Sequence, residues 1–263
     1  MKKKWLLALP LLSTSLFFNA CTSNETANGN VPFEVRMTDS PGEYKSVKID
    51  LLRVEVKISE DNDDAKGWQI LKNVKPGIYD LLELTNGKDV LIASDEFPVG
   101  KISQLRLILG DNNSVTTQDG QTVTMKTPSA QTSGLKLKIN ATLQAGITYK
   151  LLLDFDASRS IVKTGNGKFN LKPVIRAIAE AQSGAIKGTV SPAESLPAVW
   201  AISNTDSIGT YADANGNFLI KGVPAGSYRV AFAPKNPFKP KSLDGVTVNT
   251  GAVTDLKVVT INQ

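Results

Sequence analysis

The sequence contains no histidine and only one cysteine among its 263 residues. Without an imidazole, the chain cannot supply the general base of a Ser-His or Cys-His pair, nor a histidine ligand for a metal. A lone cysteine also excludes a disulfide within the chain and a cysteine-based zinc site. The composition therefore excludes hydrolases that use a Ser-His or Cys-His pair and zinc sites that use histidine or cysteine. A binding protein, a structural protein or an enzyme that uses carboxylates is still compatible with it.

The sequence also lacks an apolar run long enough to cross a bilayer, which takes about 20 residues. Its longest apolar segment covers only residues 5–18, follows three lysines and ends shortly before Cys21. A basic start, a short apolar core and a small residue at the break are typical of an export signal. We expect residues 1–20 to form a signal peptide and the polar residues 21–31 to form a flexible tether.

Net charge is nearly absent outside this leader. The formal charge of +5 includes Lys2, Lys3 and Lys4, and removing residues 1–20 leaves 27 Lys and Arg against 25 Asp and Glu. The remaining charges alternate in sign, with no basic stripe and no interleaved aromatics. The sequence therefore predicts no nucleic-acid partner.

From residue 32 the apolar positions recur with a period of two. Phe33, Val35 and Met37 fall on one face and polar residues on the other, which is typical of a strand with one buried face. In the run 46–58 the doubled Leu51-Leu52 shifts the phase, as a β-bulge would. Further strands are expected at residues 68–72, 78–84, 103–109, 121–126, 135–140 and 147–154.

Turn signals such as Ser40-Pro41-Gly42 and Asn86-Gly87 separate these strands, and no amphipathic helix is evident. We therefore predict an antiparallel β-sandwich over residues 32–180. The pattern resets near Gly184, and residues 184–263 predict a second sandwich. The fold class is thus all-β, with two antiparallel β-sandwich domains in tandem after the signal peptide.

Two carboxylates, Asp154 and Asp156, stand in an apolar strand and are expected to project from the same face. They are candidates for a metal site, since carboxylate oxygens suit calcium, or for ion pairs with Arg159 or Lys172. No cofactor is otherwise expected beyond a covalent lipid on Cys21.

The "TGNG" run at residues 164–167 precedes another alternating strand rather than a helix, so it does not predict a phosphate-binding loop. We expect Asn166-Gly167 to form a hairpin turn with positive φ, which would make residues 151–178 a closing hairpin of the first domain.

Other local patterns carry weaker signals. Two Ser-x-x-Lys spacings, Ser133 to Lys136 and Ser160 to Lys163, lie in strand-patterned segments, where such residues would point to opposite faces. The acidic loop "SEDNDDAKG" at residues 59–67 lacks the calcium-loop spacing and is interpreted as a solvated loop tip. A glycan hydrolase that uses a carboxylate pair stays as a distant alternative, without a local signature.

Carbohydrate binding needs exposed aromatic rings, and the second domain offers Trp200 and Phe238 as candidates. Trp200 alternates with Val199 and Ala201, so either the tryptophan or its neighbours face outward. Ser207 is a candidate for O-glycosylation, because Asp206-Ser207-Ile208 resembles the short acceptor motif used in Bacteroidota.

The segment "FNAC" resembles a bacterial lipobox, although Phe18 and Asn19 depart from the usual pattern. This resemblance implies a diacylglycerol on Cys21, and hence a membrane partner through the N-terminal lipid. The blocks "VRMTDSPGEYKSVKIDLLRVEV", "YDLLELTNG" and "LLLDFDASRSIVKTGNGKFNLKPVIRAI" resemble a family of uncharacterised lipoprotein domains common in Bacteroidota, over residues 33–178. The block "DANGNFLIKGVPAGSYRV" resembles the carboxypeptidase regulatory-like, or transthyretin-like, sandwich over residues 184–261.

These resemblances imply a non-enzymatic lipoprotein of the cell envelope, placed at the outer membrane and facing the periplasm or the surface. We expect it to bind or scaffold a glycan or another envelope protein. A carbohydrate-binding accessory lipoprotein is the alternative reading, since related sandwiches include starch-binding domains.

Overall fold

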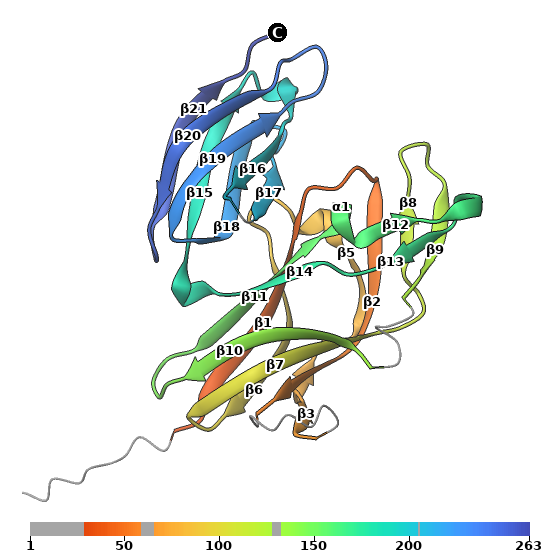
Figure 1. The fold of residues 1–263 in the computed structure, drawn as a ribbon, viewed down its shortest axis with the longest axis vertical. Coiled ribbons are helices and arrows are strands. Elements are labelled where there is room, and N and C mark those ends of the chain that lie inside the picture. The colour runs from red at the N-terminus through yellow and green to blue at the C-terminus, as the bar shows by residue number, and fades with distance from the viewer. Residues whose placement is uncertain (1–28, 59–65, 128–132, 205) are drawn as a thin grey trace, which may run out of the picture.

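The computed structural model describes residues 29–58, 66–127, 133–204 and 206–263. They form two β-sandwiches that follow one another along the long axis (Figure 1). The first sandwich is built from the red-to-green part of the chain and the second from the blue part. Each has its own cluster of buried apolar residues, so the predicted all-β class with tandem sandwiches is confirmed.

The first sandwich has a five-stranded and a nine-stranded sheet. The five-stranded sheet has the order β14-β11-β1-β6-β4, and the main path of the other is β10-β7-β2-β8-β9-β13-β12. The strands are β1 (Val31–Ser40), β2 (Ser46–Lys57), β3 (Trp68–Ile70), β4 (Asn73–Val74), β5 (Gly77–Asp80), β6 (Val90–Phe97), β7 (Gly100–Leu109), β8 (Ser114–Thr116), β9 (Thr122–Lys126), β10 (Leu135–Leu143), β11 (Tyr149–Asp156), β12 (Ile161–Lys163), β13 (Phe169–Leu171) and β14 (Ile175–Ala179).

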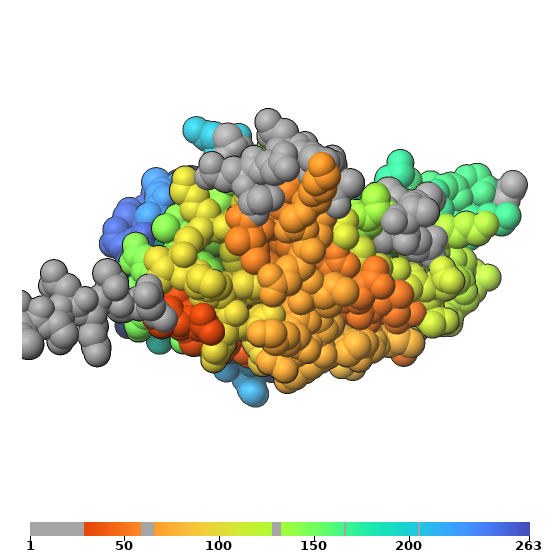
Figure 2. Space-filling view, turned by 90° about the horizontal axis from the view of Figure 1, so that it is seen from below, coloured from red at the N-terminus to blue at the C-terminus, as the bar shows by residue number. Residues whose placement is uncertain are grey.

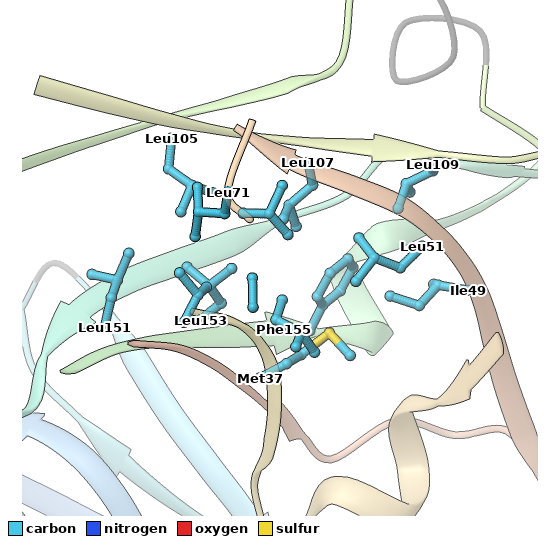
Figure 3. Packing of buried hydrophobic residues seen from close by; sticks show 14 of the residues in the cluster. Met37, Ile49, Leu51, Leu71, Leu105, Leu107, Leu109, Leu151, Leu153 and Phe155 are labelled. Carbon is cyan, nitrogen blue, oxygen red and sulfur yellow. The ribbon is translucent and has the colours of Figure 1, made fainter. Parts of the chain in front are cut away.

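The core of this sandwich lies between the two sheets (Figure 3). Met37 and Leu153 project from one sheet toward Leu105 and Leu107 of the other, and all four are buried. Period two produces this layer, because alternate side chains of each strand face inward. The expected bulge in β2 is present, since its pairing with β7 shifts between Leu51 and Arg53.

The second sandwich packs a three-stranded sheet, β18-β15-β21, against a four-stranded sheet, β17-β16-β19-β20. Phe218 and Ile220 point inward, and Asp213 accepts two backbone hydrogen bonds in the tight turn before them. Its strands are β15 (Ser183–Ser191), β16 (Ala198–Ile202), β17 (Ser207–Tyr211), β18 (Asn217–Pro224), β19 (Gly226–Ala233), β20 (Lys241–Val248) and β21 (Val253–Thr260).

Several details differ from the sequence expectation. Pairs β1·β11, β9·β13 and β15·β21 are parallel, so the sheets are mixed rather than wholly antiparallel. The strand expected at 78–84 ends at Asp80, whose side chain caps a 3₁₀ turn. Short helical turns are present at η1 (Leu81–Leu84), α1 (Ala157–Ser160), η2 (Gly165–Gly167), η3 (Glu180–Gln182) and η4 (Ala193–Ser195).

The closing hairpin is smaller than predicted. β12 and β13 pair antiparallel around η2, and Gly167 has the expected positive φ of 70°. β11, however, belongs to the other sheet, where it pairs with β1 and β14. One turn of helix, α1, separates β11 from the hairpin and carries the chain between the sheets.

Seen from below, the first sandwich hides most of the second, whose blue residues show only at the margins (Figure 2). The strands β8, β9, β12 and β13 extend to one side (Figure 1). The described part of the chain includes no helix with the length and apolar character required to span a membrane.

Candidate functional site

The contact between the two sandwiches, called the joint below, includes a group of buried carboxylates. The parallel register of β1 and β11 places Thr38 opposite Asp154 and Ser40 opposite Asp156, so the two strands end side by side. Asp39, Asp154 and Asp156 are all buried there. We call these three residues the aspartate cluster.

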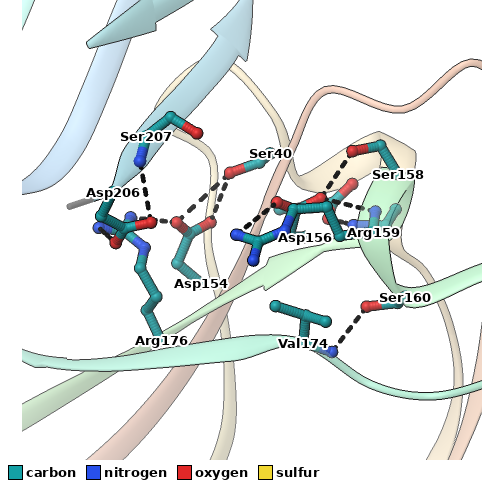
Figure 4. A network of polar contacts seen from close by, with 12 residues as sticks. Ser40, Asp154, Asp156, Ser158, Arg159, Ser160, Val174, Arg176, Asp206 and Ser207 are labelled. Carbon is teal, nitrogen blue, oxygen red and sulfur yellow. Dashed lines mark hydrogen bonds and ion pairs between the residues drawn. The ribbon is translucent and has the colours of Figure 1, made fainter. Parts of the chain in front are cut away.

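Asp154 is held by groups from the two neighbouring strands, β14 and β1 (Figure 4). Arg176 of β14 lies directly across the sheet and forms an ion pair with it, and Ser40 Oγ donates to its Oδ1 at 3.2 Å. The same guanidinium reaches Asp206 of the second sandwich at 3.5 Å. Burial raises the pKa of Asp154, although Arg176 and Ser40 oppose the rise. Asp154 thus helps to place the arginine that bridges the joint.

Asp156 has a local structural role. Its Oδ1 accepts hydrogen bonds from the backbone N–H of Arg159 at 2.9 Å and from Ser158 Oγ at 2.7 Å, which caps α1. The Arg159 guanidinium lies 3.9 Å from its other oxygen. Of the roles expected for the two aspartates, the structure shows ion pairs, with Arg176 in the place expected for Lys172.

Asp39 is the least satisfied member of the cluster. Its Oδ1 accepts from the backbone N–H of Ala157 at 3.1 Å, while its buried Oδ2 has no hydrogen-bond partner among the described residues. Burial, together with the charges of Asp154 and Asp156, raises its pKa well above the ordinary value. Asp39 borders a space of about 10 Å³ between the sandwiches. The sequence carried no signal for this residue.

A second group of charges joins the sandwiches elsewhere. Asp89, just before β6, pairs with Arg36 of β1 and with Lys221 of β18, whose Nζ lies 2.8 Å from Asp89 Oδ2. Although burial acts to raise it, hydrogen bonds from Lys221 and Arg36 hold the pKa of Asp89 below its ordinary value. We call Arg36, Asp89 and Lys221 the Asp89 cluster.

The Asn86-Gly87 turn fits into the second sandwich. Asn86 accepts from the backbone N–H of Leu219 at 2.8 Å, and its own N–H donates to Thr210 Oγ1 at 2.6 Å. Both turn residues have positive φ, 57° and 72°. A Cβ on Gly87 would lie 2.5 Å from Leu219 Cδ2, so glycine is needed for this close approach. Tyr211 adds a third contact, its hydroxyl donating to Gly42 O at 2.8 Å.

The aromatic candidates are separated. Val199 and Ala201 point into the core, so Trp200 lies on the outer face of β16, half-buried. A Cβ on Gly209 of the neighbouring strand would overlap its ring, so the ring lies directly over the backbone of β17. Phe238 is half-buried and packs against the second core.

The remaining candidates have different surroundings. Ser207 opens β17, half-buried, and its backbone N–H donates to Asp206 Oδ1 at 2.8 Å (Figure 4). Ser160 is fully buried and its Oγ accepts from the Val174 N–H at 2.8 Å, whereas Lys163 is exposed. Cys21 and residues 59–65 of the acidic loop lie outside the described residues.

Within the described ranges, no three His, Cys, Asp or Glu side chains are grouped so that they could hold a metal ion. A metal ion held by Asp154 and Asp156, as expected from the sequence, would therefore find no third ligand of this kind among the described residues. The residues that sequence reasoning missed are Asp39, Arg36, Asp89 and Lys221. Near these residues, the sequence offered only the Asn86-Gly87 dipeptide as a pattern, and that dipeptide predicted a turn and not a contact between the sandwiches.

A family model described as "Domain of unknown function (DUF4382)" matches residues 30–173, more than half of the chain. No curated protein matches the sequence. Among solved structures, a type II cohesin–X-dockerin complex from Acetivibrio cellulolyticus is 22% identical over 30% of this chain, with a TM-score of 0.25. This chain covers 56% of that one, little more than half of its length.

Two further structures match most of the chain at lower identity. The Bacillus anthracis TIE protein is 12% identical over 89% of this chain and 35% of its own, with a TM-score of 0.24. A fimbrial protein from Bacteroides ovatus is 11% identical over 89% of this chain and 50% of its own, with a TM-score of 0.21. At these TM-scores the likenesses carry no argument about fold or function.

Proposed function

The chain belongs to the family described as "Domain of unknown function (DUF4382)", and from this premise we propose that it is a non-enzymatic lipoprotein of the cell envelope that acts as a binding or scaffolding module. In this proposal Cys21 carries the lipid, residues 22–31 form the tether, and the two sandwiches project from the outer membrane. The proposal also includes a carboxypeptidase regulatory-like relationship for the second sandwich.

The observation that carries the proposal is the joint. Neighbouring domains of one chain move relative to each other by default, unless their interface is large or specific. Here Arg176, the ion-pair partner of Asp154, the Asp89 cluster and the Asn86-Gly87 turn each make directional contacts with the second sandwich. Several directional contacts at separate places favour one relative arrangement, which is what a module that presents a surface requires.

The joint is testable by distance measurement. Cys21→Ala leaves no thiol, so spin labels can be placed at Lys150→Cys in β11 and Ser227→Cys in β19, both exposed. We expect a single narrow distance distribution. The matched control is Arg176→Met with Asp89→Asn, which removes the ion pairs of both clusters. This double variant should broaden the distance distribution. A broad distribution in the unmodified joint would contradict a scaffolding role.

The anchor is tested separately. Radiolabelled palmitate fed to cells that express the full chain should label the protein, and Cys21→Ala should abolish the label while the protein is still made. Ser23→Ala, two residues further on, is the control and should leave labelling intact. Label that survives Cys21→Ala would refute the anchor without affecting the distance result.

A second candidate function is glycan binding at Trp200, and its outward, half-buried ring is the observation that favours it. One face of the ring is covered by β17, which leaves a flat apolar surface of the kind that packs on sugar rings. A glycan-array screen should then give hits that Trp200→Ala removes and Phe238→Ala retains, because Phe238 packs against the core.

A further inference from the structure

A groove of about 380 Å³ opens at the joint, and both sandwiches supply its walls. The first contributes Tyr44 and Lys45 from the segment between β1 and β2, and Gln118 from the turn between β8 and β9. The second contributes Tyr211 at the end of β17 and Lys235 beyond β19. A volume of this size is typical of small-ligand sites. The site is complete only where the sandwiches meet.

Hydrogen bonds fix the positions of these residues. The backbone N–H of Lys45 donates to β8 at 2.8 Å, and that of Lys235 donates to Ser195 O at 3.0 Å. The Tyr211 hydroxyl is held on Gly42 O across the joint. The groove is therefore preorganised by contacts within each sandwich and by the Tyr211 contact between them.

The charged residues of the lining are both basic. Lys45 and Lys235 are exposed and form no ion pair with another residue in the described ranges. Glu43 lies near enough to act on the hydroxyls of Tyr44 and Tyr211, but it does not line the groove. Asp119, next to Gln118 in the sequence, lies near enough to interact with the charge of Lys45, but it does not line the groove either. Two ammonium groups beside an opening whose described lining holds no carboxylate attract a ligand that carries negative charge.

The uncharged lining offers flat rings and polar groups. Tyr44 and Tyr211 are half-buried, and burial raises the pKa of both hydroxyls, so they stay neutral. The Tyr211 hydroxyl donates to Gly42 O, and its oxygen can still accept a hydrogen bond. Gln118 adds an amide. Leu196, also in the lining, has a φ of 35°, an uncommon conformation for a leucine. Such backbone positions concentrate at ligand sites.

We propose that this groove binds an acidic oligosaccharide, with its carboxylates at Lys45 and Lys235 and its sugar rings on Tyr44 and Tyr211. This deepens the binding role proposed above and rests on it, but it requires neither the lipid nor Trp200. Tyrosine rings supply apolar faces for sugar C–H groups, and the hydroxyls and amide can hydrogen-bond sugar hydroxyls.

The lining favours a sugar acid over other anions. Phosphate recognition typically uses arginine forks or converging backbone N–H groups, and the described lining contains no arginine. An acidic peptide would be expected to extend a sheet edge, whereas the lysines and Tyr44 lie on segments outside strands. The experiment also measures binding of inorganic phosphate and of an acidic peptide, so it can identify either as the better ligand.

The experiment is calorimetric titration of Cys21→Ala protein with trigalacturonate, triglucuronate and trimannuronate, each compared with its uncharged methyl ester. We expect at least one acid to bind and its ester to bind about tenfold more weakly, a difference that equals about 1.4 kcal/mol. Inorganic phosphate and hexaglutamate are titrated in parallel. Failure of all three acids, equal affinity for the esters, or tighter binding of phosphate or hexaglutamate would overturn the proposal.

Variants locate the site. Lys45→Gln with Lys235→Gln should weaken binding about tenfold, while Lys150→Gln with Lys187→Gln, the same change in net charge on exposed lysines that do not line the groove, should leave it unchanged. Equal weakening in both double variants would indicate nonspecific charge attraction and would refute the proposal that the groove is the binding site. Unfolding midpoints show that the variants fold, and the spin-label distances show separately whether the joint itself is intact.

Discussion

The two charge clusters of the joint are built in opposite ways. In the Asp89 cluster one carboxylate meets two cations, one from each sandwich. In the aspartate cluster three carboxylates lie together, of which Asp154 pairs with Arg176, and Arg159 approaches Asp156 from the exposed rim. The pKa of Asp89 is lowered, whereas those of Asp39 and Asp154 are raised. One interface therefore contains two responses to pH with opposite sign.

This difference shows where the joint is vulnerable. An aspartate with two cationic partners keeps one of them when the other is removed, so its cluster tolerates single substitutions. Arg176 has no second cation to replace it, because it is the ion-pair partner of both Asp154 and Asp206. The predictions below separate the two clusters, starting with the largest effect.

Arg176→Met should be the most damaging substitution. It leaves Asp154, 4% exposed, without its cation and next to two other carboxylates, and breaking a buried pair in this way costs about 3 kcal/mol. The free energy of unfolding in urea measures the loss. Asp154→Asn in the same background removes the stranded charge and should recover most of it. A double variant no more stable than the single one would show that the arginine acts through packing alone.

The turn that precedes Asp89 can be disturbed without changing a charge. Gly87→Ala combines an unfavourable φ of 72° with a close approach to Leu219, so we expect a loss of about 2 kcal/mol in the free energy of unfolding. Gly146→Ala is the matched control. Its φ is 77° with no heavy atom near the added Cβ, so it should show only the backbone strain of about 1 kcal/mol. Equal losses would mean that the Asn86-Gly87 turn adds nothing to the joint.

This turn also shows how far the sequence could lead. Period two predicted the β class and the bulge in β2, because these depend on neighbours in the chain. Asn86-Gly87 predicted a turn, and both residues have the positive φ that such turns use. The dipeptide does not encode what the turn contacts, however, and Leu219 lies 133 positions away.

Other misses have similar causes. β6 was not expected, because Asp95 is buried within it and breaks the apolar alternation; its carboxylate accepts from the Lys72 N–H instead. The partner of Asp154 depends on the antiparallel register of β11 and β14, which places Arg176 opposite it. Registers and domain contacts arise from the whole fold, so the charges of the joint had no local signature.

Asp39→Asn should stabilise the protein at neutral pH, in contrast to the two substitutions above. Because the pKa of Asp39 is raised in the folded protein, its contribution to stability is complete below about pH 4 and is lost as the pH rises through the raised value. Asparagine removes that loss, and we expect a gain of about 1 kcal/mol at pH 7.

The measurement is the free energy of unfolding between pH 4 and pH 9, roughly the range over which a raised aspartate pKa acts. The Asp39→Asn profile should fall less steeply with rising pH than the original, although Asp154 still contributes in the same direction. Asp244→Asn, at an exposed position in β20, is the control and should leave the profile unchanged. A profile of Asp39→Asn that overlays the original would remove Asp39 as a source of pH dependence.

Lys221→Met tests the opposite cluster and should have the smallest effect, about 1 kcal/mol, because Arg36 still compensates Asp89. The pKa of Asp89 is lowered on folding, so its contribution is present above about pH 4 and is lost as the pH falls through the lowered value. Lys221→Met should therefore reduce stability at pH 7 and flatten the acid limb of the profile. The same substitution combined with Arg36→Met should cost more than the two single losses added together, since Asp89 is then left without a cation. Strict additivity would mean that the two cations act independently, and the contrast between the clusters would then come from burial alone.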